Sequence, residues 1–211
     1  MIPNRSFRPA PVTARDRLLE AGVKLIRRQG FAATSVDELC REAGVTKGAF
    51  FHHFASKEDL GARLADYWGA STSGFFSEAP FRQHGDPLDR VLAYLDLRIA
   101  LIGGPAEGFS CVAGTMVQEA FLTSGAIRSA CRDSIMGNAD LMVDDLRAAI
   151  AARGVDADAE SLARHMQAVI QGAFVLAKIQ DDEATAGEVA RESLQHFKRY
   201  LTLLFEKGTV Q

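Results

Sequence analysis

Four helix starts follow one another closely near the amino terminus, and this spacing constrains the fold more than any other feature of the sequence. Thr13, Ser35, Thr46 and Ser56 each suit an N-cap, and an acidic residue follows three positions after each of them except Thr46. Gly30 and Gly44 suit the helix ends. We therefore expect four helices in quick succession, the second barely two turns long and the fourth continuing past Trp68.

The rest of the chain also has helical periodicity, without an alternating strand pattern or an internal repeat. Asp86-Pro87 is typical of a helix start, and Gly103-Gly104-Pro105 is typical of a break. The sequence predicts an all-α fold of about nine helices. The later helices are expected near residues 86–102, 112–123, 126–153, 158–180 and 186–206.

Charge and hydropathy exclude some classes of protein. The net charge of −3 hides an asymmetry: residues 1–60 carry ten Lys or Arg against seven Asp or Glu, and residues 61–211 carry fourteen against twenty. The amino-terminal part therefore suits a polyanion. The longest charge-free helical stretch, residues 165–177, is too short to span a bilayer, and no apolar signal segment follows the first arginines. We expect a cytoplasmic protein.

Residues 35–53 have the pattern of a helix-turn-helix. The turn Ala43-Gly44-Val45 lets two short helices cross steeply, with Val45 anchoring the crossing, and the second helix can then present its amino-terminal residues to a major groove.

At these residues the sequence resembles a known family. Residues 43–60, AGVTKGAFFHHFASKEDL, look like the recognition segment of TetR (tetracycline-repressor) family transcription regulators, and residues 17–39, RLLEAGVKLIRRQGFAATSVDEL, are similar to the helices before it. The close resemblance covers about residues 13–68. It implies an all-helical homodimer with a three-helix DNA-binding head, a connecting fourth helix and a ligand-binding body. Phe51 stands where that family usually has a tyrosine that contacts phosphate, and Phe51 cannot donate that hydrogen bond.

The candidate DNA-binding residues divide by chemistry. Phosphate contacts, which position the protein, are expected from the donors of Thr34, Ser35, Lys47, His53 and Lys57. Contacts to bases, which specify the sequence, are expected from Thr46, Gly48, Ala49 and His52. Capping by Thr34 and Ser35 and a solvated basic face are the simpler alternatives. Phe50 and Phe54 are expected in the core.

The body combines aromatic residues and methionines with few charges. Each of these side chains is typical of a core, but together they suit a cavity for an apolar or aromatic effector, with Gln118, Glu119 and Tyr94 as polar anchors. The candidate ligand-binding residues are Trp68, Tyr94, Phe109, Cys111, Met116, Phe121 and Phe174.

Cysteine and histidine spacing gives no metal or cofactor site. Cys40, Cys111 and Cys131 are far apart without a CxxC pair, so we expect reduced thiols. Cys111 follows a glycine-proline break, where oxidant or electrophile sensing competes with simple packing. His52 and His53 point in different directions on a helix and lack a third ligand. No Walker loop, GxGxxG or GxSxG motif is present, so we expect neither cofactor nor enzyme.

The last two helices have more apolar positions than one core-facing stripe needs, so we expect a homodimer through them. We expect a flexible arm at residues 1–12, a helix-turn-helix domain at 13–60, a linking helix at 57–76, and a ligand-binding and dimerisation domain at 61–211.

The predicted function is a dimeric repressor that binds a near-palindromic operator and leaves it when an unidentified small molecule binds. Two alternatives remain open: a constitutive DNA-binding regulator without an effector, and a ligand-binding protein whose DNA head is degenerate.

Overall fold

The computed structural model describes residues 13–207, and all regular secondary structure in this range is helical. Eleven α-helices and one 3-10 helix lie in the described part of the chain, so the predicted all-α fold is confirmed. The predicted flexible arm, residues 1–12, lies outside the described residues. Within the described range, no helix is long and apolar enough to cross a membrane.

The four amino-terminal helices begin where their caps predict. They are α1 (Ala14–Gln29), α2 (Val36–Ala43), α3 (Lys47–His53) and α4 (Lys57–Ser77). Complete capping boxes join Thr13 to Asp16 and Ser35 to Glu38. The box predicted at Ser56 is only half formed, because the Asp59 carboxylate accepts from the backbone N–H of Ala55 instead. These caps satisfy the free amides of helices too short to be stable alone.

The turn between α2 and α3 has the predicted glycine geometry. Gly44 ends α2 at φ +62° and ψ +41°, a left-handed conformation that a residue with a Cβ adopts at a cost. The Val45 N–H then donates to the Cys40 carbonyl at 2.9 Å, which redirects the chain into α3.

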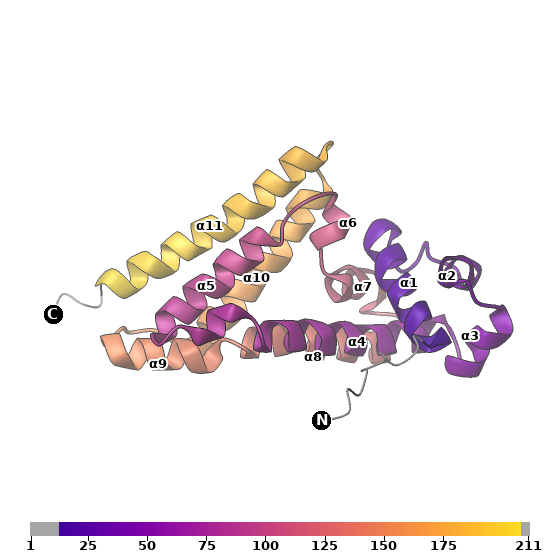
Figure 1. Cartoon of the computed structure of the whole chain (residues 1–211), viewed down its shortest axis with the longest axis horizontal. Helices are drawn as coiled ribbons and strands as arrows, with labels where there is room; N and C mark the ends of the chain where they lie inside the picture. The colour runs from indigo at the N-terminus through magenta and orange to yellow at the C-terminus, as the bar shows by residue number, and fades with distance from the viewer. Residues whose placement is uncertain (1–12, 208–211) are drawn as a thin grey trace, which may run out of the picture.

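The remaining helices form an elongated body beside this head (Figure 1). The α4 helix packs lengthwise against α8, and α10 packs against α11. The elements of the body are η1 (Pro80–Gln83), α5 (Pro87–Ala100), α6 (Ala106–Phe109), α7 (Val112–Ala120), α8 (Gly125–Asp140), α9 (Val143–Arg153), α10 (Ala159–Lys178) and α11 (Glu183–Lys207).

The helix expected at 126–153 is interrupted between Asp140 and Val143. Arg82 stabilises this break: its Nη2 donates to the Leu141 carbonyl at 3.1 Å, and its Nη1 donates to Asp145 in the first turn of α9 at 3.1 Å. One guanidinium therefore satisfies a carbonyl at the end of one helix and a carboxylate at the start of the next. With η1 and α6, this break accounts for the additional helices.

Two apolar cores hold the molecule together. One joins the head to α7 and the first half of α8, through residues such as Leu18, Leu64, Met116 and Ile127. The other joins α5, α9, α10 and α11 to the end of α4. Because α7 and α8 contribute to the head's own core, the body is packed directly against the helices that carry the helix-turn-helix.

Candidate functional site

The amino-terminal half of α3 forms an open surface at one end of the molecule (Figure 1). Thr46, Lys47 and Gly48 are exposed, and Ala49 is half-buried. The Thr46 hydroxyl accepts from the Ala49 N–H at 3.2 Å, which fixes the start of the helix. A Cβ on Gly48 would meet only Thr46 Oγ1, at 3.7 Å. A flat, unobstructed helix start of this kind suits close approach to a groove.

Several predicted contact residues surround this surface. The Lys47 ammonium pairs with Asp37 at 2.7 Å, and both side chains are about 60% exposed. His52 is exposed and His53 half-buried, with their rings in edge contact. Ser35 is exposed and caps α2. These side chains are accessible together, as a DNA-binding role requires, but that role stays a prediction.

Phe50 and Phe54 lie in the core, as expected, at 0% and 1% exposure. The ring of Phe51, in contrast, is 57% exposed and meets Phe50 edge-on at 5.2 Å. Phe51 therefore presents an apolar ring to solvent, where a tyrosine would present a hydrogen-bond donor.

Two residues assigned to phosphate contact have structural positions instead. The Thr34 hydroxyl donates to the Gly30 carbonyl at 2.7 Å, and its residue is 1% exposed, so the hydroxyl cannot face a phosphate here. The Lys57 ammonium donates to the carbonyls of Phe31 and Thr34 at 3.1 and 3.0 Å and to that of Ala32 at 3.3 Å, and it lies 4.6 Å above the Phe31 ring centre. Lys57 thus holds the turn between α1 and α2.

Four of the seven predicted ligand-binding residues meet in the body: Trp68, Phe109, Cys111 and Phe174 line one cavity. Its volume is only about 30 Å³, which is the space of a single water molecule. These four residues therefore lie together and pack closely, and their role in ligand binding stays a prediction.

The other three predicted ligand-binding residues lie elsewhere. Tyr94 is fully buried between Phe76 and Phe81, and its hydroxyl accepts from Arg98 Nε at 2.8 Å. Met116 is fully buried in the core on the head side. Phe121 is 47% exposed at the end of α7. Helical periodicity predicts that such side chains lie on the apolar face of a helix. It does not predict which core or which surface that face contacts.

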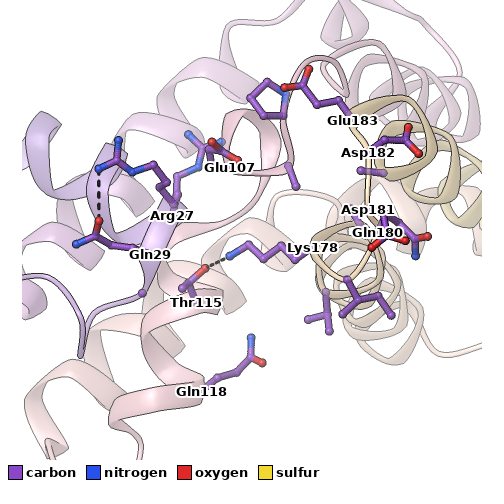
Figure 2. Close-up of a pocket in the computed structure, with 18 of the residues that line it drawn as sticks. Arg27, Gln29, Glu107, Thr115, Gln118, Lys178, Gln180, Asp181, Asp182 and Glu183 are labelled. Atoms are coloured by element: carbon purple, nitrogen blue, oxygen red, sulfur yellow. Dashed lines mark hydrogen bonds between the residues drawn. The ribbon is translucent and has the colours of Figure 1, made fainter.

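A larger cleft, of about 650 Å³, opens between head and body (Figure 2). Its walls come from the end of α1, from α6 and α7, and from the connection between α10 and α11. Arg27, Thr115, Gln118 and Lys178 line it. Of the candidate ligand-binding residues and polar anchors predicted from the sequence, only the anchors Gln118 and Glu119 belong to this cleft.

Two cations of the cleft have perturbed acid–base properties. Desolvation lowers the pKa of the Arg27 guanidinium. Desolvation, and secondarily the nearby charge of Arg27, lowers the pKa of the Lys178 ammonium. The Lys178 ammonium donates to Thr115 Oγ1 at 2.7 Å. Arg27 is half-buried and Lys178 is exposed, so the environment opposes the charge of Arg27 while water partly screens that of Lys178.

Glu119 links α7 of the body to the head. Its Oε2 accepts from the Ala32 N–H at 2.6 Å. Gly30, at φ +89°, leaves room for this carboxylate, since a Cβ there would lie 2.4 Å from Glu119 Oε1. Glycine is therefore needed at this position for both conformation and space. Within residues 13–207, no group of three His, Cys, Asp or Glu residues could hold a metal ion.

Comparisons with known proteins match this architecture. The sequence model of a family described as bacterial regulatory proteins, tetR family, matches residues 18–64, and that of the tetracyclin repressor-like C-terminal domain matches residues 87–193.

Individual relatives agree with the two family matches. The HTH-type transcriptional repressor NemR of Escherichia coli is 35% identical over 80 residues, which are 38% of this chain and 40% of NemR. The transcriptional regulator AcuR of Cereibacter sphaeroides is 28% identical over 131 residues, 61% of this chain and 57% of AcuR. The chain thus spans less than two thirds of the length of these curated relatives.

Solved structures extend the likeness over nearly the whole chain. The crystal structure of reduced E. coli NemR superimposes with a TM-score of 0.73 and 26% identity, covering 89% of this chain and 96% of that one. A regulatory protein TetR from Rhodobacter sphaeroides, at 24% identity and a TM-score of 0.74, shares the fold, with 89% and 96% of the two chains covered. The carboxy-terminal family model alone matches half of the sequence, and the chain belongs to the TetR family of bacterial regulatory proteins.

Proposed function

We propose that this chain is a DNA-binding transcriptional regulator, a repressor whose α3 enters the major groove of an operator and which leaves it when a small molecule binds. The observation that carries the proposal is the unobstructed start of α3, where Thr46, Lys47 and Gly48 are exposed at the tip of the head. The proposed function implies a cytoplasmic protein, because the bacterial chromosome lies there.

The proposed active species is a homodimer formed through α10 and α11. One line of small and apolar residues on α10, Ala168, Gly172 and Leu176, is exposed, and Tyr200 and Leu203 are exposed on α11. Small residues allow two helices to approach closely across a two-fold axis. Such a dimer presents two copies of α3 to two half-sites and therefore favours a near-palindromic operator.

We propose the domain division on the same basis: a head at residues 13–60, a linking helix that begins at residue 57, and a body that ends with the dimerisation helices. Under this division α1 to α3 meet DNA, and the cleft beside α1 lies at the boundary between head and body.

A gel-shift experiment with matched glycine substitutions tests the proposal. Gly48→Glu places a carboxylate on the open face of α3, and Gly74→Glu places one on an exposed part of α4, where a Cβ meets nothing within 4 Å. Because a carboxylate repels phosphate, Gly48→Glu should weaken binding to the DNA upstream of its own gene at least about tenfold, or about 1.4 kcal/mol, while Gly74→Glu should not. Neither should lower the melting temperature.

The same experiment separates the alternatives. Equal DNA affinity of the two variants would contradict the role of α3. A wild-type protein that binds no upstream fragment at low salt would favour the ligand-binding protein with a degenerate head, for which the exposed Phe51 is the supporting observation. Binding that no ligand of the protein weakens would favour the constitutive regulator.

A further inference from the structure

The cleft between head and body holds two cations that lack acidic partners. Arg27 extends from α1, and Lys178 extends from the last turn of α10, so each belongs to a different half of the molecule. Within the described part of the chain, neither forms an ion pair. Arg27 Nε is buried without a hydrogen-bond partner, although the Arg27 guanidinium lies 5.2 Å from the centre of the Trp68 ring. The ammonium of Lys178, an exposed residue, donates to the neutral hydroxyl of Thr115.

The acidic groups of the cleft offset the charge of these cations only in part: Glu107 acts on both cations and Glu119 acts on Lys178, but neither carboxylate forms an ion pair with them. Glu119 is bound to the Ala32 amide, and Asp182 caps α11 by accepting from the Thr185 N–H at 2.9 Å. Glu107, Asp181 and Glu183 also line the cleft. Figure 2 shows the Lys178 side chain extended toward Thr115, away from Asp181 and Asp182 on the connection between α10 and α11 and from Glu183 at the start of α11. Lys178 is therefore directed to the α7 side of the cleft, whereas Asp181, Asp182 and Glu183 lie at the start of α11 and just before it.

This arrangement has an energetic cost that an anion would relieve. Desolvation lowers the pKa of both Arg27 and Lys178, and the charge of Arg27 lowers the pKa of Lys178 further. A carboxylate between the two groups would accept from both and offset their repulsion, and charge-assisted hydrogen bonds of this kind are stronger than neutral ones. Thr115 and Gln118 supply neutral partners beside them.

We propose that this cleft binds a small organic acid, with its carboxylate between Arg27 and Lys178 and its apolar part against Pro105, Ala106 and Ala186. The volume of about 650 Å³ lies in the range of small-molecule sites. The inference rests on the proposed function, since it identifies the site and the chemical class of the effector.

The location explains how such a ligand would reach the DNA-binding head. Arg27 is on α1 of the head, and Thr115 and Gln118 share α7 with Glu119, which binds the Ala32 amide. A carboxylate in the cleft thus contacts both sides of the hydrogen bond that joins body and head. Only a ligand that prefers one arrangement of these two parts can change DNA affinity, and contact with both parts provides that preference.

The first test is direct binding to the full-length protein, without DNA. Acetate, benzoate and octanoate are titrated calorimetrically up to about 10 mM, each beside its uncharged amide. At least one acid should bind, and its amide should bind at least about tenfold more weakly. Lys178→Gln and Arg27→Gln should each weaken the acid about tenfold or more. Lys198→Gln, which removes a lysine paired with Asp96 outside the cleft, should leave affinity unchanged.

Several results would overturn the inference. They are no binding of any of the three acids, equal binding of acid and amide, or equal losses in Lys178→Gln and Lys198→Gln. Melting temperatures show whether a variant fails to fold. If either Arg27→Gln or Lys178→Gln does not fold, the acid affinity of the remaining variant still tests the inference.

A gel shift with the acid that binds then separates this inference from the proposed function. Release of DNA by the acid, but not by its amide, supports both. Binding of the acid by a protein that binds no DNA contradicts the proposed function and leaves the site intact. Binding of DNA and acid without mutual effect overturns the effector role.

Discussion

Replacing Lys57 with methionine tests whether this lysine holds the head together or contacts DNA. Methionine keeps an unbranched stem near the Phe31 ring but removes the ammonium, which donates to the carbonyls of Phe31, Ala32 and Thr34 at 3.1, 3.3 and 3.0 Å. A hydrogen bond to a charged group contributes about 1.5–3 kcal/mol. Three bonds to one ammonium are not additive, and the one to Ala32 is exposed, so we expect a loss of about 2–4 kcal/mol.

Thermal and urea unfolding followed by circular dichroism measure this loss. In a chain of 211 residues, the expected decrease in melting temperature is about 5–10 °C, at a fixed protein concentration because a dimer's stability depends on it. The control is Lys24→Met, which removes a surface ion pair with Glu42 and should cost about 1 kcal/mol at most. An unchanged unfolding midpoint in Lys57→Met, together with a flatter salt dependence of DNA binding, would refute the structural role of Lys57. It would instead support the prediction that Lys57 contacts a phosphate.

Three further predictions concern charge and burial. Lys47→Ala should make the negative slope of log K against log[salt] for DNA binding less steep by about 0.9, the value for one phosphate contact. An unchanged slope in a gel-shift series would count against that contact. Asp145→Ala should destabilise the fold by about 2–4 kcal/mol in urea, because two arginines lose their shared carboxylate. The neighbouring Asp144→Ala, at a side chain 94% exposed, should have little effect, and equal costs would contradict the role of the buried cluster. Burial raises the pKa of the Cys131 thiol to about 12, so iodoacetamide at pH 8 should modify it far more slowly in the folded protein than in urea, whereas equal rates would exclude that burial.

The parts of the fold that the sequence predicts are those fixed by neighbouring residues. The caps at Thr13, Ser35 and Thr46 and the glycine turn at Gly44 act over three or four positions, and the structure has each of them. Binary pattern and turn chemistry agree in this segment, which is why the head is predictable. The core positions of Phe50 and Phe54 are likewise predictable, since residues four apart lie on the same face of a helix.

Features that depend on distant residues could not be predicted in this way. Thr34 and Lys57 carry donors suited to phosphate, and only the folded turn shows that backbone carbonyls occupy those donors. The cleft brings Arg27 beside Lys178, two residues separated by most of the chain. In the sequence, Arg27 and Lys178 are ordinary cationic residues of helices. The position of Lys178 after the apolar stripe of α10 does not indicate that Arg27 lines the same cleft.

The two cavities favour different mechanisms of release, and their sizes decide between them. The cavity beside Cys111 has a volume of about 30 Å³, so anything larger than water must first separate the packed helices around it. The cleft at α1 is already open, with about 650 Å³. A ligand there need only bind the DNA-incompetent arrangement about 5- to 150-fold more tightly, a coupling of about 1–3 kcal/mol. Contacts with α1 and α7 on either side of the Glu119–Ala32 hydrogen bond can supply that difference. A ligand in the cavity beside Cys111 would reach the head through α4 or through α6 and α7, which contact α1, but only after the packed helices separate.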